Sequence, residues 1–263
     1  LNKIILASKS KVRKSILDEN NIVNNVIPSN IDEEIVKESL IKKKASPEII
    51  SKNLAELKAN KVSLKELDQH VLGADSVIDL EGELISKPEN REEALYILQK
   101  LNGKKHYLIS SVCISKNGSM IWNYTDKAML TMKKFTAHDL KTYLSKISDE
   151  ALYAYNVYQI EGEGRKLFSN IEGDRNTIMG LPIKKIKNSL LLFENNIEEH
   201  IRNRKKISKT IQNTLFEKYQ FLNQQKEQKG LLDIFDNSSI KPPAGSGDCC
   251  APKLLQYAFQ HQL

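Results

Sequence analysis

The chain has 263 residues, 40% of them hydrophobic, which is enough for one large domain or two small ones with a core. Its net charge of +7 is spread along the chain and does not point to a dedicated nucleic-acid binder. Three cysteines, two of them adjacent, exclude a disulfide framework, and no Cys/His spacing suggests zinc. Without a membrane-length apolar run or an export pattern, we expect a cytoplasmic protein.

The first half of the chain alternates between short apolar runs and segments with helical apolar spacing. The expected elements are a strand at 3–7, a helix at 12–17 under a serine cap, a helix at 47–67, a strand at 71–78 and a helix at 92–101. Asn102 and Gly103 provide a C-cap for the last of these helices.

The second half begins with strand patterns and returns to helices. We expect strands at 107–115 and 119–124 joined by a turn at 116–118, a pairing strand at 128–132, a helix at 136–147, short strand ends at 158–162 and 177–180, and a helix at 183–196. Strands that alternate with helices predict a mixed α/β fold, with a body at 1–196.

Residues 197–263 form a C-terminal extension that we expect to be helical, basic and partly disordered. A helical apolar stripe continues through 207–222, and a linker is expected at 241–247. Five basic residues cluster between 202 and 209 without an acidic neighbour. The plainest interpretation of this cluster is a solvated helix face, and the alternative is an RNA-binding surface.

Common catalytic and nucleotide-binding signatures are absent from the sequence, which has no P-loop, HExxH or GxSxG motif. Asp75 is therefore the most informative residue, because it lies within an apolar strand, after Gly73 and Ala74. A buried, unpaired carboxylate is costly, so packing alone does not explain it. The bland alternative is that Asp75 caps a turn.

Several basic and polar residues near strand ends are candidates for binding an anion. Ser10 and Arg13 lie at a strand-to-helix turn, where free backbone N–H groups favour anions. Lys58 precedes the Asp75 strand on a helix, and Lys87 comes just before the next helix. Each lysine taken alone could be solvated surface, and an N-cap role explains Ser10 equally well.

Together these residues match a family pattern. The matching runs are residues 6–13 (LASKSKVR), 32–33 (DE), 54–59 (LAELKA), 73–77 (GADSV), 86–88 (SKP), 101–106 (LNGKKH), 158–164 (YQIEGEG) and 178–182 (IMGLP). They occur in the order and at the spacing of the Maf family of nucleoside triphosphate pyrophosphatases, which residues 3–193 strongly resemble. Each motif alone is only a weak sign of the family, but the whole set, in this order and at this spacing, is specific to it.

The resemblance implies a mixed-sheet, inosine-triphosphatase-like fold with a cleft between two lobes, usually in a homodimer. It implies hydrolysis of a nucleoside triphosphate to the monophosphate and pyrophosphate, with Mg²⁺ or Mn²⁺ as cofactor. By position, Asp75 matches the catalytic aspartate and Glu33 the cleft carboxylate, and both could ligate the metal. The phosphate-binding set is matched by Ser10, Arg13, Lys58 and Lys87.

Three positions bear on the preferred substrate. Many family members have two arginines where this chain has Val12 and Arg13, so one cation is missing unless Lys9, Lys11 or Lys14 replaces it. Glu161 resembles the position that carries Gln in members acting on dTTP and UTP and Glu in members acting on 7-methyl-GTP.

A carboxylate at position 161 only accepts hydrogen bonds, so it favours guanine-like donors. The methylguanosine branch, however, usually has an aromatic residue at the position of Val12 and Gln at that of Ser76. We therefore expect a purine or modified-purine triphosphate, unless Glu161 only pairs with a lysine. Removal of non-canonical or modified nucleotides is the expected role.

A second resemblance covers only the end of the chain. Residues 243–258 (PAGSGDCCAPKLLQYA) resemble a segment of some bacterial RNA pseudouridine synthases, without the catalytic domain of those enzymes. The alternative hypothesis for the whole chain is accordingly an inactive Maf-like or RNA-associated module that binds through its basic extension.

Overall fold

The computed structural model describes residues 3–149, 152, 157–160, 162–223, 225–236, 242 and 250–261. It divides into two compact units, Leu1–Leu192 and Phe193–Leu263. No helix within the described ranges is both long enough and apolar enough to cross a membrane.

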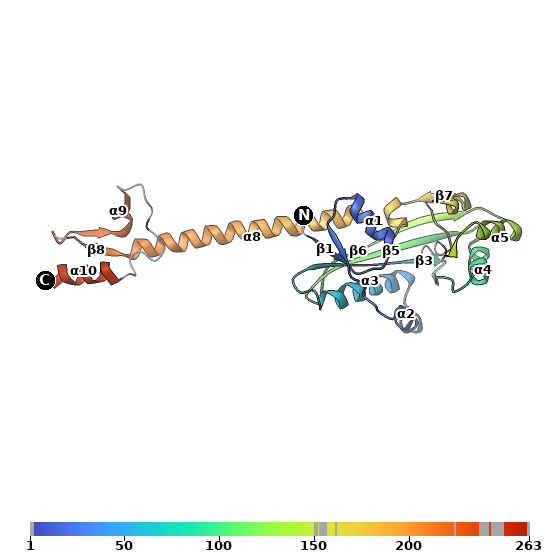
Figure 1. Cartoon of the computed structure of the whole chain (residues 1–263), viewed down its shortest axis with the longest axis horizontal. Coiled ribbons are helices and arrows are strands. Elements are labelled where there is room, and N and C mark those ends of the chain that lie inside the picture. The colour runs from blue at the N-terminus through green and yellow to red at the C-terminus, as the bar shows by residue number, and fades with distance from the viewer. Residues whose placement is uncertain are drawn as a thin grey trace. The chain divides into compact units, whose positions relative to one another are not determined.

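A mixed sheet forms the centre of the first unit (Figure 1). Its strands are β1 (Ile4–Leu6), β2 (Asn24–Val26), β3 (His70–Leu80), β4 (Glu83–Ile85), β5 (Lys105–Lys116), β6 (Ser119–Met132) and β7 (Phe168–Glu172). The order is β2-β1-β3-β5-β6-β7, with β4 also on β3. The β1 strand is parallel to β2 and β3, and the other pairs are antiparallel. The predicted mixed α/β class is confirmed.

One edge of β3 has a gap that positions the site. The β5 strand pairs with β3 from Val71 through Asp79. On the opposite edge, β1 pairs only with residues 70–72 and β4 only with residues 78–80. In the described part of the chain, residues 73–77 therefore have no strand neighbour on that edge. Asp75 lies in the middle of this gap.

Helices flank the sheet on both faces (Figure 1). They are α1 (Lys11–Glu19), α2 (Glu33–Lys42), α3 (Pro47–Ser63), α4 (Arg91–Leu101), α5 (Ala137–Ser145), the 3-10 helix η1 (Glu163–Leu167) and α7 (Arg175–Ile178). Of α8 (Ile183–Lys218), only the first residues, up to Leu192, belong to this unit. Ser10, Asp32 and Ser46 cap the first three through their side chains. Each cap satisfies a backbone N–H that the helix itself leaves free.

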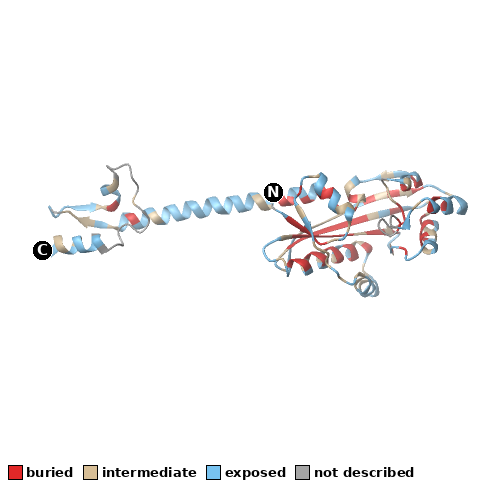
Figure 2. Cartoon of the chain, in the orientation of Figure 1, coloured by how far each residue is buried: buried red, intermediate tan, exposed pale blue. Residues whose placement is uncertain are grey.

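Burial concentrates on the sheet and on the helix faces that cover it (Figure 2). The α3 helix packs so closely on β3 that a Cβ atom at Gly73 would lie 2.1 Å from the backbone oxygen of Ala55. Only glycine allows this approach. The contact places Lys58, on α3, directly beside Asp75, on β3.

The structure confirms most elements that apolar periodicity predicted and corrects others. Residues 119–124 and 128–132 belong to the single strand β6. The expected strand end at 177–180 is wrong, because Asp174 caps the short helix α7 there. The expected strand end at 158–162 is also wrong, since its described residues form a turn that leads into η1. The α2 helix was missed because it buries no residue and so has no core-facing stripe.

The second unit contains the distal part of α8, a small hairpin of β8 (Gln220–Leu222) and β9 (Gln228–Gly230), α9 (Leu231–Asp236) and α10 (Cys250–His261). The α8 helix runs without interruption through Asn196, where the sequence analysis placed a domain end. All residues from 195 to 210 are exposed, including the basic cluster at 202–209 (Figure 2). Most of the expected linker at 241–247 lies outside the described residues.

Candidate active site

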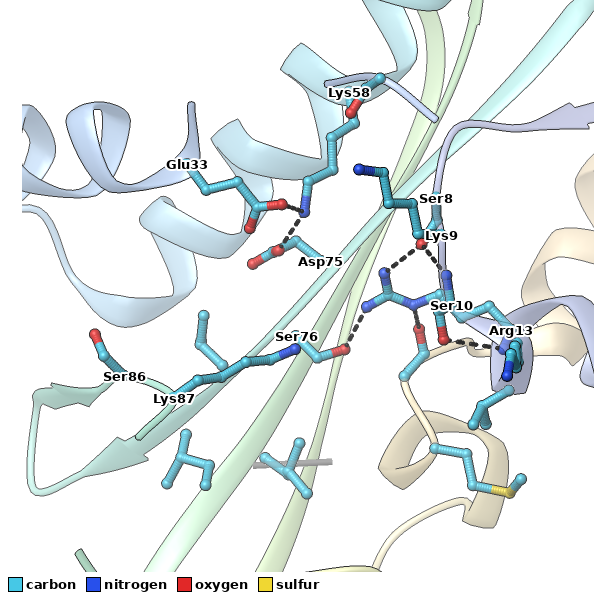
Figure 3. A pocket seen from close by; sticks show the side chains of 18 of the residues that line it. Ser8, Lys9, Ser10, Arg13, Glu33, Lys58, Asp75, Ser76, Ser86 and Lys87 are labelled. Carbon is cyan, nitrogen blue, oxygen red and sulfur yellow. Dashed lines mark hydrogen bonds and ion pairs between the residues drawn. The ribbon is translucent and has the colours of Figure 1, made fainter. Parts of the chain in front are cut away.

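A pocket of about 800 Å³ opens at the gap in β3. The loop after β1, the start of α1, α2, Lys58 of α3, the segment after β4 and the turn after α7 all contribute lining residues (Figure 3). The lining includes Ser10, Val12, Arg13, Glu33, Lys58, Asp75, Ser76 and Lys87. Eight of the nine positions singled out from the sequence thus line one pocket, although they come from five separate segments of the chain.

Lys58 joins the two candidate carboxylates. Its Nζ lies 2.8 Å from Asp75 Oδ1 and 2.9 Å from Glu33 Oε1 (Figure 3). The side chains of Lys58 and Asp75 are only 7% and 8% exposed, whereas that of Glu33 is 41% exposed. A buried ion pair of this kind must offset the loss of hydration of both groups, so the cluster is poor evidence for a purely stabilising role.

The two carboxylates have different electrostatic surroundings. Burial raises the pKa of Asp75, and the ammonium of Lys58 opposes this shift. Burial also acts on Glu33, but Lys58 together with Lys37 holds the pKa of Glu33 below its usual value. The second oxygen of Asp75, Oδ2, is buried and has no hydrogen-bond partner among the described residues. A buried carboxylate oxygen without a partner points to a ligand, water or ion at that position.

Arg13 lines the pocket and bonds extensively to the protein. Its guanidinium donates to the backbone oxygens of Ala74 (2.8 Å) and Gly180 (3.0 Å) and to the hydroxyls of Ser76 (3.0 Å) and Ser8 (3.3 Å). Arginine has five N–H donors, so one remains for a ligand.

The serines and Val12 have distinct surroundings. Ser10 Oγ accepts the backbone N–H of Arg13 at 3.3 Å, so Ser10 is an N-cap that also faces the pocket. Ser76 Oγ accepts from Arg13 and contacts Ser110 Oγ at 2.9 Å. Val12 contributes an apolar side chain to the lining.

Two lysines bring further positive charge to the pocket. Lys9 comes from the loop after β1 and Lys87 from the segment after β4 (Figure 3). Within the described ranges neither makes an ion pair. In the pocket, loss of hydration lowers the pKa of Lys87, and the positive charge of Arg13 lowers it further. Lys14 instead pairs with Asp18 and is not among the pocket-lining residues.

Glu161, the expected base-selecting residue, lies outside the described residues. Its neighbours Tyr158 and Ile160 do line the pocket. The Tyr158 hydroxyl is 2.8 Å from His106 Nε2, and its ring packs edge-on against Phe168. The segment that leads to position 161 is thus anchored in the core beside the pocket.

Sequence reasoning missed several contributors to the site. Lys37 lines the pocket one helical turn after Glu33. Gly180 belongs to the matching run 178–182 but was given no role, and it accepts a hydrogen bond from Arg13. The spacing of Glu33 and Lys37 on one helix face was the available signal for the lysine. Nothing local indicated that Gly180 would meet Arg13, since 167 positions separate them.

The fold and pocket define a class of protein. In the described part of the chain, two lysines that form no ion pair, a buried carboxylate oxygen that has no hydrogen-bond partner and a turn that contains Gly180 lie around a cavity on a mixed α/β sheet. This arrangement suits a compact, highly anionic ligand together with a cation. The chain belongs to the Maf family, because the model of that family, described as Maf-like protein, matches residues 3–193.

Two relatives of similar amino-acid sequence support this membership. A nucleoside triphosphate pyrophosphatase of Pelagibacter ubique (strain HTCC1062) is 70% identical over 194 residues, which are 74% of this chain and 100% of the relative. A 7-methyl-GTP pyrophosphatase of Brucella abortus is 38% identical over 181 residues, covering 69% of this chain and 91% of the relative. Among solved structures, a dITP/XTP pyrophosphatase from Mycobacterium abscessus covers 76% of this chain and 97% of its own, at 12% identity and a TM-score of 0.35.

Proposed function

We propose that the chain hydrolyses the bond between the α and β phosphates of a nucleoside triphosphate, releasing the monophosphate and pyrophosphate. The observation that carries this proposal is Asp75, whose buried Oδ2 has no hydrogen-bond partner in the described ranges and whose Oδ1 is held by Lys58. Relatives named as pyrophosphatases add support.

In this mechanism Asp75 accepts a proton from the attacking water. A general base works best when its pKa lies near the working pH, and burial moves the pKa of Asp75 upward, in that direction. Lys58 keeps the carboxylate ionised and fixes its orientation through the 2.8 Å hydrogen bond. As water attacks phosphorus, the bond to the bridging oxygen breaks and pyrophosphate leaves with the electron pair.

Positive charge is needed because a triphosphate carries about four negative charges that repel a nucleophile. Lys87 and Lys9 supply ammonium groups that form no ion pair with any residue the structure describes, and Ser10 lies at the N-terminus of α1. Lys9 and Lys11 both line the pocket, whereas Lys14 pairs with Asp18 and does not line it. Lys9 is our choice to compensate for Val12, because it forms no ion pair with any residue the structure describes. Lys9→Ala should raise KM for the nucleotide by about tenfold, the loss of one charged contact. An unchanged KM would remove Lys9 from this role.

The donor set fits a hard divalent cation. Asp75 Oδ2 has no hydrogen-bond partner among the described residues. The partly exposed carboxylate of Glu33 lies near it, because Lys58 pairs with both Glu33 and Asp75. No cluster of three or more His, Cys, Asp or Glu residues suited to a metal occurs in the described part of the chain. Mg²⁺ commonly takes one or two carboxylates and completes its shell with phosphates and water. A bound Mg²⁺ or Mn²⁺ would neutralise phosphate charge here.

Pyrophosphate release from a nucleotide panel tests the activity. Incubation with Mg²⁺ should yield equal amounts of monophosphate and pyrophosphate. Excess EDTA should abolish turnover, and added Mg²⁺ or Mn²⁺ should restore it. Release of single phosphate, or no release from any nucleotide with either metal, would contradict the proposal.

The substrate we propose is a purine or modified-purine triphosphate, with removal of such nucleotides as the role. Glu161 carries this preference, because a carboxylate accepts the N–H groups of a guanine edge. The test compares kcat/KM for dTTP, UTP, GTP and 7-methyl-GTP in the wild type and in Glu161→Gln. A wild-type preference of about tenfold or more for dTTP or UTP, some 1.4 kcal/mol, would refute it.

A further inference from the structure

The hydrogen bonds of Arg13 lie on both sides of Asp75. Nη1 donates to the backbone oxygen of Ala74. Nη2 donates to the hydroxyl of Ser76 (Figure 3). These are the residues immediately before and after Asp75 on β3. The contact falls in the gap between β1 and β4, where the edge of β3 has no neighbouring strand among the described residues. The guanidinium therefore bonds to β3 in the stretch where no described strand pairs with this edge.

The same guanidinium also fixes the turn that follows α7. Its Nε donates to the backbone oxygen of Gly180 at 3.0 Å. Gly180 has a φ of +91°, and a Cβ atom there would lie 2.9 Å from Ser76 Oγ and 3.3 Å from Arg13 Nε. Close approach and left-handed backbone both require glycine at this point. The turn is thus held against β3 through Arg13.

A chain of further hydrogen bonds extends this anchoring. Ser76 Oγ contacts Ser110 Oγ at 2.9 Å, and Ser110 Oγ donates to the backbone oxygen of Thr177 at 2.7 Å. Thr177 Oγ1 donates to Asp126 Oδ2 at 2.6 Å. The network links α1, β3, β5, α7 and β6 around the pocket. Its members rigidify one another, because each hydrogen bond orients the next.

A planar guanidinium can bond to several acceptors in fixed directions at once, whereas the single ammonium of a lysine cannot hold the same set. Four acceptors surround Arg13, and its fork reaches them simultaneously. Arginine normally binds phosphate through two parallel N–H groups, but only one N–H remains here.

We propose that Arg13 is a positioning residue that fixes Asp75 and the turn at 179–180 in the geometry that turnover requires, while the lysines of the pocket bind the phosphates. This proposal rests on the proposed pyrophosphatase function. It assigns to Arg13 an effect on the chemical step instead of on substrate affinity. Displacing a catalytic group by about 1 Å can cost about a hundredfold in rate.

The decisive substitution is Arg13→Lys, which conserves the charge but cannot hold the four acceptors. We expect kcat to fall at least about tenfold while KM changes by less than about threefold. Arg13→Met should show the same split. Lys14→Met, the next residue on α1, is the matched control, because Lys14 pairs with Asp18 outside the pocket lining and should leave both constants unchanged.

A phosphate ligand would behave in the opposite way. If KM rises by a larger factor than kcat falls in Arg13→Met, and Arg13→Lys restores it, Arg13 binds substrate and the proposal is overturned. Unchanged kcat in Arg13→Lys also overturns it. Ser76→Ala removes one acceptor and keeps the arginine, so it should lower kcat alone even if the Arg13 variants fold poorly.

Hydrogen exchange provides a measurement that does not depend on turnover. The amides of Gly180 and Leu181 donate to Thr177 and Asn176 within the anchored turn. In Arg13→Lys these amides should exchange faster than in the wild type, with the amides of α4 unchanged. Equal exchange would overturn the proposal. A wild type that releases no pyrophosphate would instead refute the proposed function, and the exchange result would still decide the role of Arg13.

Discussion

Asp75 lies inside a mostly apolar strand, and Lys58 is its ion-pair partner. Replacing it by asparagine keeps size and polarity but removes the base. Asp75→Asn should therefore lower turnover by at least about a hundredfold with the fold intact, the low end of what losing a general base costs. Initial rates of pyrophosphate release, with circular dichroism as a check on folding, provide the measurement.

Asp79→Asn is the matched control for this prediction. Asp79 lies on the same strand outside the pocket lining, where its Oδ1 accepts the amide of Gly82. An asparagine oxygen can accept the same bond, so this variant should keep wild-type rates. Near-native turnover by Asp75→Asn would show that another group takes the proton.

His106 predicts a pH dependence of stability. The side chain is fully buried, its Nδ1 has no hydrogen-bond partner in the part of the chain that the structure describes, and burial lowers its pKa to about 4 from 6.5. The unfolded chain thus binds a proton between these values that the folded chain does not. Stability is complete above about pH 6.5 and should fall as pH drops toward 4, by at most about 1.4 kcal/mol per unit.

Urea unfolding at a series of pH values tests this expectation. His106→Gln keeps a partner for the Tyr158 hydroxyl but cannot titrate, so its stability should depend less on pH over that range. His138→Gln, at an exposed position on α5, should leave the pH dependence unchanged. Equal slopes in the wild type and in His106→Gln would contradict the assignment.

At the scale of elements, the contact of α3 with β3 sets the distance between Lys58 and Asp75. A methyl group at Gly73 would meet the backbone of Ala55 and Ala59 at 2.1 and 2.7 Å. Gly73→Ala should therefore lower the free energy of unfolding by about 1–3 kcal/mol, as overpacking usually does. It should also reduce turnover, since relief of the clash moves Lys58 away from Asp75.

Denaturant unfolding and initial rates measured on Gly73→Ala check both parts. Gly162→Ala is the control for stability, because its added methyl group would meet its neighbours only at 3.4 Å or more. An unfolding midpoint equal to that of the wild type would show that α3 and β3 can move apart without loss of stability.

Elements also show where prediction from sequence succeeds. The helices α1, α3, α4 and α5 combine a cap with an apolar stripe, so local signals agree with the fold. The α7 helix has only four residues, too few for periodicity to be read. The segment at 158–160 has strand-like residues, but packing of Tyr158 against His106 and Phe168 decides its backbone.

At the scale of the whole molecule, we expect residues 197–263 to be dispensable for catalysis. The last of the pocket-lining residues is Gly180, and residues 195–210 of α8 are exposed. A chain ending at Asn196 should remain folded and keep kcat/KM within about twofold of the full chain. Loss of activity with the fold intact would show that the extension completes the site.

A chain ending at Lys185 is the control for this truncation. It removes Ile186 and Leu190, which are 0% and 5% exposed in the first unit. Loss of two buried aliphatic side chains should cost roughly 3–6 kcal/mol and unfold much of the population. Salt-sensitive RNA binding by the full chain, and not by the chain ending at Asn196, would favour the RNA-associated alternative.

The amino-acid sequence by itself determined the α/β class, most helices and the candidate residues, because caps, periodicity and a carboxylate in an apolar strand are local signals. Only the tertiary structure decided how these residues act. It placed Lys58 between two carboxylates, left Asp75 Oδ2 without a partner and engaged Arg13 with Gly180. The physical reason is that burial and hydrogen bonding depend on which distant segments meet, and the 167 positions between Arg13 and Gly180 carry no local signal of their contact.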